Sequence, residues 1–287
     1  MFGFIAKHRV VWPVRWMWEM LDVSRGGFYE WLKRPESQHT LDDARLLGHV
    51  RTSFAASDET YGARRVWRDL QAWGFECGLH RIERLMGSAR LKARRARRRR
   101  PTDIGPRLEH SIAGNVLDRQ FEAIGPTLKW TADFTYLWTH EGWLFVAVVI
   151  DLYSRRVVGW SSSARMTADL VMDALMTAIW RRGTPKSLMH HSDRGSQYTS
   201  ERFQALLNEH GIECSMSRSG NCWDNAVAES FFSTMKVERT DHKFYSTRDQ
   251  AKADVFDYIE RFYNARRRHS TLGYVSPIDF EQMAAVA

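Results

Sequence analysis

The sequence contains few cysteines and no long apolar segment. Three cysteines, Cys77, Cys214 and Cys222, occur in 287 residues, and no two of them have the spacing of zinc ligands. Three thiols cannot all pair within one chain, so we expect reduced cysteines and a cytoplasmic location. The first residues, MFGFIAKHRVVW, lack the apolar core and the small-residue cleavage site of a signal peptide. No apolar run approaches the roughly 18 residues of a membrane span, so no membrane partner is expected.

Positive charge is what the sequence has in excess, and it is concentrated at one end. The net charge is +8. Residues 1–110 carry 22 Lys and Arg against 13 Asp and Glu, whereas the remaining residues carry 20 against 21. This asymmetry predicts a polyanionic partner, and nucleic acid is the usual one. The chain is also long enough to form two domains, each with its own core.

Residues 1–100 are predicted to form a helical DNA-binding region. Two stretches, 14–33 and 60–87, each have the pattern of two helices joined by a short turn, which is typical of a helix-turn-helix. In the first stretch, Ser24 is placed to cap the second helix. A plain helical hairpin would give the same pattern. In the second stretch, the last helix has an apolar stripe of Leu79, Ile82, Leu85 and Met86.

A strongly basic run follows at residues 90–100, where eight of eleven residues are Lys or Arg. Because like charges repel one another, we expect an extended segment that contacts DNA phosphates and releases their counterions. A solvated linker is the alternative. A linker is predicted over residues 101–120, which include Pro101 and Pro106. The candidate DNA contacts of the run are Arg90, Lys92, Arg94, Arg95, Arg97, Arg98, Arg99 and Arg100.

Residues 121–240 change from helical spacing to the patterns of strands alternating with helices. This order predicts an α/β fold of the ribonuclease H type, with a mixed five-stranded sheet and flanking helices. Residues 241–287 are expected to hold a C-terminal helix near 248–263 and a basic tail. The expected elements are strands at 128–137, 143–153 and 157–163, a helix at 167–182, a strand at 187–193, a helix at 200–210, a strand at 212–217, and a helix at 226–239 capped by Asp224 or Asn225.

Three carboxylates lie on three different predicted elements of this second domain. Asp133 lies in the middle of a strand, Asp193 at the end of another, and Glu229 in the first turn of a helix. Hard cations such as Mg²⁺ prefer oxygen ligands and are often held by a few carboxylates together with substrate phosphate. Two such ions can stabilise the attacking and leaving oxygens of a phosphodiester. We therefore interpret the three acids as a catalytic and metal-binding set.

Each of these acids also has a simpler explanation. Asp133 could be an exposed strand carboxylate, Asp193 a turn former, and Glu229 an acid favoured by the helix dipole. Asp151 and Asp224 are available as substitute ligands.

The neighbouring residues favour the catalytic interpretation. Lys236 follows Glu229 by about two helical turns, so both side chains project from one face and the lysine can reach a phosphate. A solvated helix lysine is the alternative. Donors are also expected around Asp193, from His191, Ser192, Arg194 and Gln197.

Several long motifs resemble one known family. HSDRGSQYTS, SMSRSGNCWDNAVAESFFSTMKVE and YNARRRHSTLGYVSP are similar to the second open reading frame (OrfB) of the IS-three group of bacterial insertion-sequence transposases. LDVSRGGFYEW and TYGARRVWRDLQAWG extend the resemblance to the N-terminal helices. The resemblance implies an integrase-like catalytic core of the DDE type. By position, the triad is Asp133, Asp193 and Glu229, and Lys236 is the associated basic residue.

The resemblance also implies an activity and partners. The expected reaction is metal-dependent cleavage of a phosphodiester at the element ends, followed by transfer of the freed 3′-OH into target DNA. The expected cofactor is Mg²⁺ as two ions, with Mn²⁺ as a substitute. The expected partners are double-stranded DNA (terminal repeats and target), further copies of the chain in a synaptic complex, and the upstream-frame product (OrfA). The expected location is the cytoplasm of a bacterium, at the nucleoid.

Two alternative functions remain open at this stage. One is a DNA-binding regulator with an inactive core, and the other is a ribonuclease H-like nuclease that only hydrolyses. In each of the three cases the basic C-terminal segment would add to DNA binding, through Arg266, Arg267 and Arg268.

Overall fold

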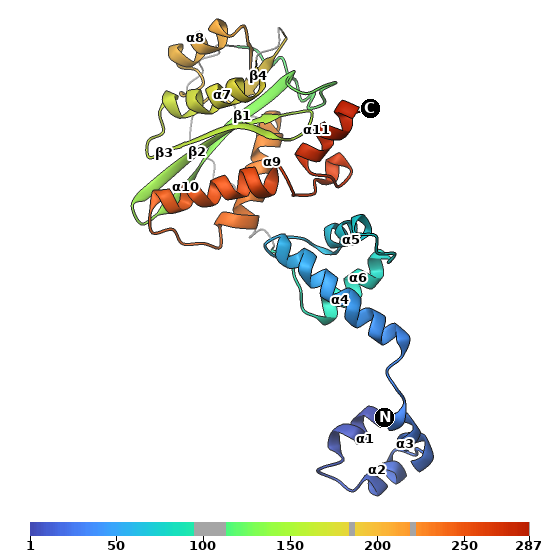
Figure 1. The fold of residues 1–287 in the computed structure, drawn as a ribbon. Coiled ribbons are helices and arrows are strands. Elements are labelled where there is room, and N and C mark those ends of the chain that lie inside the picture. The colour runs from blue at the N-terminus through green and yellow to red at the C-terminus, as the bar shows by residue number, and fades with distance from the viewer. Residues whose placement is uncertain (95–112, 184–186, 219–221, 287) are drawn as a thin grey trace.

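The computed structural model describes residues 1–94, 113–183, 187–218 and 222–286. Helices alone occupy the described residues before position 95, and the sheet and its helices follow (Figure 1). The first six helices are α1 (Phe2–His8), α2 (Val14–Met20), α3 (Arg25–Lys33), α4 (Gln38–Ala56), α5 (Ala63–Ala72) and α6 (Leu79–Ser88). Most of the basic run and much of the predicted linker lie outside the described residues.

Helices α1–α3 pack on one another and lie apart from the rest of the chain (Figure 1). Their buried apolar side chains are Ile5, Met17 and Phe28. Ser24 accepts a hydrogen bond from the Gly27 amide at 3.0 Å at the start of α3, so the predicted cap is confirmed. The first helix pair predicted from the sequence is thus present, with α1 added in front of it.

Helices α4–α6 form a second unit that packs against the core. Val66, Leu70 and Ile82 are fully buried, and they belong to the same apolar cluster as residues of the sheet and of later helices. The Trp67 indole donates to the Cys77 carbonyl at 2.7 Å, which fixes the turn between α5 and α6. The predicted stripe on the last helix is confirmed for Ile82, Leu85 and Met86.

The sheet has five strands in the order β3-β2-β1-β4-β5. The first three strands pair antiparallel, whereas β4 is parallel to both β1 and β5. The mixed five-stranded sheet predicted from the sequence is therefore confirmed. The strands are β1 (Lys129–Thr139), β2 (Gly142–Asp151), β3 (Val157–Ser163), β4 (Met189–Ser192) and β5 (Glu213–Met216).

Helices cover both faces of the sheet. On one face, α7 and α8 pack on Trp130, Ala132 and Val149. Gly159 permits a close crossing there, because a Cβ atom at this position would lie 2.3 Å from the Ala174 carbonyl oxygen of α7. On the other face, α9, α10 and the π-helix η3 pack on alternate residues such as Val146 and Val148. The covering helices are α7 (Ala168–Arg182), α8 (Glu201–Glu209), α9 (Ala226–Met235), α10 (Arg248–Phe256) and η3 (Asp257–Tyr263).

Two predicted helices have nearly their expected ends, but the last part of each is a π-helix. The helix predicted at 226–239 is α9 followed at once by a π-helix, η2 (Lys236–Thr240), and the helix predicted near 248–263 is α10 followed by η3. A short turn, η4 (Ser270–Leu272), and a last helix, α11 (Pro277–Val286), complete the fold. Within the part of the chain that the structure describes, no helix is long and apolar enough to cross a membrane.

Candidate active site

Strand register brings Asp133 and Asp193 to the same level of the sheet. Thr131 of β1 pairs with His191 of the parallel neighbour β4, and each aspartate lies two residues beyond its member of that pair. Asp133 is partly buried and accepts a hydrogen bond from the Phe134 amide at 2.8 Å. Asp193 follows β4 directly and accepts from the Gly195 amide at 2.9 Å. Both carboxylates are therefore oriented by backbone amides close to their own positions.

Asn225 fastens the start of α9 to the strand that carries Asp133. Its side chain accepts from the Thr131 hydroxyl at 2.5 Å and donates to the Ala132 carbonyl at 3.1 Å. Asn225 occupies the predicted N-cap position of α9, but its side chain makes no cap bond there. The Asp224 carboxylate is instead held by Arg218 and Arg119. The contact between Asn225 and β1 places the first turn of α9 beside Asp133, and the sequence did not reveal it.

Glu229 and Lys236 approach the same region from α9 and its continuation. Glu229 lies in the first turn of α9 and is exposed. Lys236 is the first residue of η2, and its ammonium lies 5.5 Å from the ring centroid of Tyr136. Tyr136 is three residues beyond Asp133 on β1. The lysine therefore reaches the sheet near the strand aspartate.

The pKa of Asp133 records this crowding of charge. Burial raises it from the ordinary value to about 8, and the Asp193 carboxylate is the next largest cause. Glu229 adds a smaller rise, whereas the Phe134 amide and Lys236 act in the opposite direction. Asp133 thus lies in the field of the other two acids and of the lysine.

The donor set suits a hard divalent cation, although the side chains are not arranged to hold one. Three carboxylates that repel each other and raise a neighbour's pKa offer oxygen ligands, which Mg²⁺ prefers. Among the described residues, no group of three His, Cys, Asp or Glu side chains is positioned to hold a metal ion.

The two substitute acids have structural roles. Asp151 is fully buried and accepts from the Thr127 amide at 2.6 Å and the Tyr153 amide at 2.8 Å. Hydrogen bonds from Arg218 hold the pKa of Asp224 well below its usual range. Both carboxylates are fully engaged in fixing loops, so neither replaces a member of the triad.

Two of the four donors expected around Asp193, His191 and Gln197, bind other groups instead. His191 faces Ser215 at 2.9 Å and Ser217 at 3.2 Å, and burial lowers its pKa to about 4. The Gln197 amide donates to the Met166 carbonyl at 3.4 Å. His191 and Gln197 therefore fasten β4 and its following loop, through partners on or beside β5 and near α7.

Tyr198 is a polar residue near the acids that the sequence did not single out. Its side chain is 1% exposed, and its hydroxyl has no hydrogen-bond partner within the described part of the chain. Burial raises the pKa of Tyr198 far above its ordinary value, and Asp133 and Asp193 raise it further. An aromatic residue at this place is typical of a core position, so its pattern gave no signal.

Apart from Lys236, the predicted DNA contacts fall into three groups. Arg95, Arg97, Arg98, Arg99 and Arg100 lie outside the described residues. Arg90, Lys92 and Arg266 are exposed. The remaining three, Arg94, Arg267 and Arg268, face protein.

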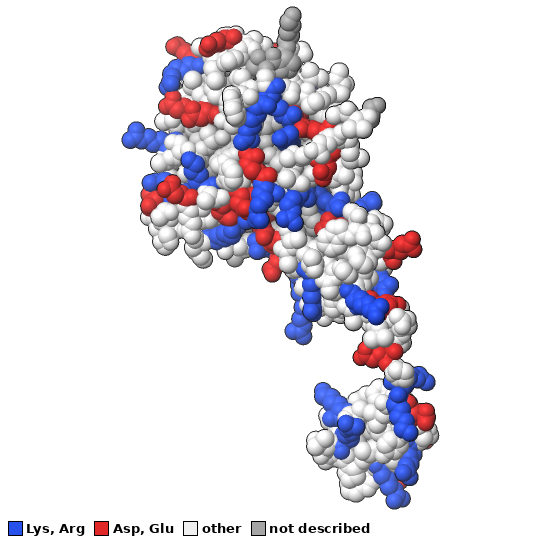
Figure 2. Space-filling model, viewed as in Figure 1, with Lys and Arg blue, Asp and Glu red and all other residues white. Residues whose placement is uncertain are grey.

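For the two inward-facing arginines of the C-terminal segment, the expectation of DNA contact needs correction. Arg267 has a side chain 6% exposed and binds Glu238, and Arg268 binds Asp69 at 2.6 Å. Arg94 also donates to the protein, to the Glu238 carbonyl at 2.8 Å. Lys and Arg side chains gather where α4–α6 meet the core (Figure 2), and several of them are bound to acids there.

Family comparisons divide the chain into the same kinds of unit. Residues 40–100 match a family described as an HTH-like domain. Residues 125–222 and 210–277 match two families that are both described as an integrase core domain. These matches agree with the ribonuclease H-like, integrase-type class expected for the sheet and with helix-turn-helix character in the preceding helices.

Close relatives cover almost the entire chain. It is 41% identical over 284 residues to the transposase InsF for insertion sequence IS3A of Escherichia coli (strain K12), spanning 98% of both chains. It is 38% identical to a 31 kDa protein of insertion element IS600 from Shigella sonnei, over 94% of this chain and 100% of that one.

Solved structures resemble the chain more distantly. The catalytic core domain of HTLV-2 integrase, in complex with magnesium, has a TM-score of 0.40 at 14% identity, covering 55% of this chain and 98% of that one. The catalytic core domain of BIV integrase also has a TM-score of 0.40, at 19% identity, over 56% and 97%.

Proposed function

This chain belongs to the IS3 family of insertion-sequence transposases and is a DNA transposase, and we propose that Asp133, Asp193 and Glu229 form its active site. One observation carries the assignment. The register of β1 and β4 sets the two aspartates level, and Asn225 fastens the helix of Glu229 to β1 beside them. The raised pKa of Asp133, caused by burial and then by Asp193, supports the same grouping.

In this proposal the three carboxylates hold the metal and Lys236 holds DNA. Two Mg²⁺ ions, or Mn²⁺ in their place, would supply positive charge at the attacking and leaving oxygens of the phosphodiester. Asp133, Asp193 and Glu229 would hold these ions through their carboxylate oxygens. Lys236 then contacts the phosphate beside the scissile bond and aligns it by charge.

The remaining units supply the grip on DNA. Residues 1–100 contain the two helical units and the basic run, and residues 121–240 contain the proposed site. The exposed Arg90, Lys92 and Arg266 are candidate phosphate contacts. We further propose that the chain acts on terminal repeats and target DNA as several copies in one synaptic complex, with the upstream-frame product as fusion or partner.

A strand-transfer assay tests the site and separates it from the alternatives. Labelled element ends are incubated with the protein and Mg²⁺ or Mn²⁺, with and without the upstream-frame product. Joined product supports the proposal, nicks alone indicate hydrolysis only, and DNA binding without product indicates a regulator.

Substitution of the acids makes the assay specific. Asp133→Asn, Asp193→Asn and Glu229→Gln should each abolish cleavage and joining, because each removes a ligand charge without changing side-chain size. Folding and DNA binding should persist. Asp173→Asn, an exposed acid on α7, is the matched control and should retain full activity. Near wild-type joining by any of the three triad variants would remove that residue from the site.

A further inference from the structure

The helix of Glu229 does not stop at the active site. Lys236 ends α9 with helical backbone angles, φ −60° and ψ −50°, and the chain continues without a break into η2. Glu229, Lys236 and Glu238 therefore lie along one continuous helical rod. A π-helix is rare and often occurs at functional sites. Whatever holds η2 also sets the position of the two residues proposed to act on DNA.

The core holds η2 through the Glu238 carboxylate. Glu238 is 7% exposed and receives two hydrogen bonds from Arg267, from Nε at 2.7 Å and from Nη2 at 2.8 Å. The Tyr258 hydroxyl of η3 donates to the same carboxylate at 2.9 Å. A paired arrangement of this kind fixes geometry as well as charge.

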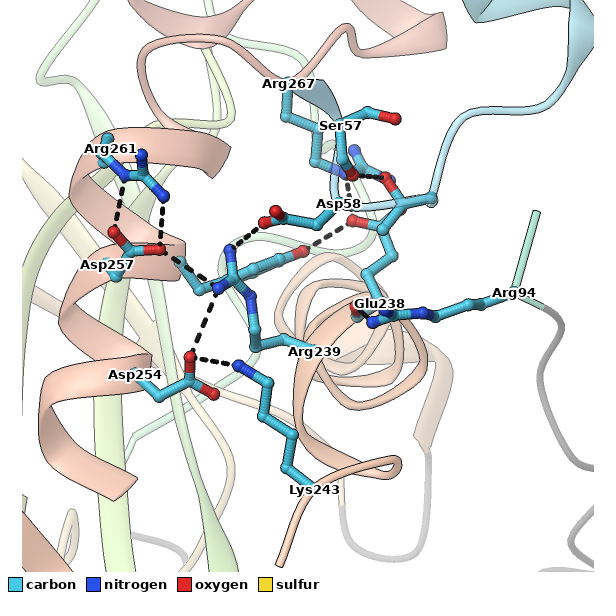
Figure 3. Close-up of polar contacts among 12 residues, drawn as sticks. Ser57, Asp58, Arg94, Glu238, Arg239, Lys243, Asp254, Asp257, Arg261 and Arg267 are labelled. Carbon is cyan, nitrogen blue, oxygen red and sulfur yellow. Dashed lines mark hydrogen bonds and ion pairs between the residues drawn. The ribbon is translucent and has the colours of Figure 1, made fainter. Parts of the chain in front are cut away.

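The α4–α6 unit holds the same turn of helix from the opposite side. Arg65 of α5 approaches Glu238 Oε1 at 3.4 Å. Asp58, which follows α4, accepts from Arg239 Nη2 at 2.6 Å. Arg94, beyond α6, donates to the Glu238 carbonyl at 2.8 Å. Figure 3 shows Asp58 and Arg94 reaching the neighbouring residues Arg239 and Glu238.

Tyr61 adds contacts that hold the α4–α6 unit in place against the C-terminal segment. Its hydroxyl donates to the Arg266 carbonyl at 3.1 Å and accepts from the Arg268 amide at 2.8 Å. Its ring lies 6.3 Å from that of Phe262. The apolar cluster of the unit is also continuous with α9 through residues such as Phe231 and Met235. The unit is thus fixed in both position and orientation relative to the rod.

We propose that Arg65 is a positioning residue for transposition: through Glu238 it aligns the DNA held by α4–α6 with Glu229 and Lys236. This inference rests on the proposed active site. Arg65 is the residue that tests this inference. When Arg65 is removed, Arg267 still neutralises Glu238, so the fold survives. A small misplacement of reacting groups is costly in rate, so the link affects the chemical step and not the grip on DNA.

The test uses the full chain, assembled on labelled element-end DNA at saturating concentration. Single-turnover cleavage and joining are measured for Arg65→Ala and Arg65→Lys. Arg64→Ala is the matched control, because Arg64 is the preceding residue of α5, carries the same charge and is exposed. We expect Arg65→Ala to lower the saturating rate by about ten-fold or more, Arg65→Lys to recover part of it, and Arg64→Ala to stay within about two-fold.

Each other outcome overturns the proposal. An unchanged saturating rate with a weaker Kd and a flatter salt dependence would make Arg65 a phosphate contact. A lower melting temperature with an unchanged rate per folded molecule would make it purely structural. A faster rate would mean that the link restrains the site. Glu229→Gln is run in parallel. If this variant keeps its activity, the proposed active site fails. If it is inactive while Arg65→Ala is unchanged, only the present inference fails.

Discussion

The two helical units before the basic run bury their apolar residues in different ways. In α1–α3, Ile5, Met17 and Phe28 form a small cluster of their own. In α4–α6, residues such as Val50 and Leu70 join a cluster that continues through the sheet and α9. The first unit is therefore stabilised locally, whereas the second shares its stability with the catalytic core.

Charge shows the same contrast. Arg15 and Glu19 of α2 form an ion pair with side chains 81% and 63% exposed. At the junction of α4–α6 with the core, Arg267 and Glu238 pair with side chains 6% and 9% exposed. Exposed pairs contribute little because water and salt screen them, whereas loss of one member of a buried pair leaves a charge unpaired.

This difference gives the two units different uses. A unit that shares a core with the active site can only present DNA in one orientation. A unit with its own core, joined by the short stretch before α4, lacks this constraint, so we propose that it can adjust its orientation to DNA. The two helical units look alike in sequence, and they differ in how they are attached to the core.

The largest expected effect comes from removing the buried acid at the junction. Glu238→Ala should lower the free energy of unfolding by about 3–5 kcal/mol, because Arg267 is left buried without its partner. Glu19→Ala, in the exposed pair, should change it by less than about 0.5 kcal/mol. Urea denaturation of both variants measures the contrast. Equal losses would show that the two units are attached in the same way.

Acid should weaken the junction by a smaller amount. Burial lowers the pKa of His269 to about 4, and nearby Arg267, Arg155 and Arg65 lower it too, with Glu238 opposing. The unfolded chain therefore takes up this proton first. The stabilisation is complete above about pH 6.5 and is lost as pH falls towards 4, by about 3 kcal/mol.

A histidine variant checks that sign. His269→Gln should flatten the loss of stability between pH 6.5 and pH 4, and His242→Gln, at an exposed position, should not. Hydrogen exchange should place the acid-induced opening at α4–α6 and leave α1–α3 unchanged. A steeper loss in the His269→Gln variant would reverse the assignment.

Sequence patterns predicted the five strands and most of the helices with approximate ends, but not α1 or α11. Local periodicity of apolar residues indicates the strands and α7. The cap at Ser24 is also local, because the amide that it accepts from lies three residues away. The three acids were singled out from their predicted elements and identified as a triad by the family resemblance, and strand register explains why Asp133 and Asp193 lie level. Local patterns do not encode such register.

Contacts between distant segments could not be predicted. Arg267 and Arg268 belong to a basic segment, and their partners lie 29 and 199 residues away. When no partner is known, a run of arginines indicates contact with DNA. In the folded chain, Arg267 and Arg268 bind acidic side chains instead. Asn225 was predicted only as a cap. Its bond to β1 was missed because the two residues lie 93 positions apart in the sequence.

The smallest expected effect tests whether α1–α3 is separate. Ser24 caps α3 by accepting from the Gly27 amide, and Ser24→Ala should cost about 1 kcal/mol. If the unit is stabilised only by its own cluster, this loss stays within it. Amides of residues 25–33 should then exchange faster, while those of α4–α6 and the midpoint of core unfolding stay unchanged. Ser37→Ala, which removes the cap of α4, is the matched variant and should alter exchange at the start of α4 instead. Slower joining or a lower core midpoint in Ser24→Ala would show that α1–α3 is coupled to the core, and the contrast between the units would fail.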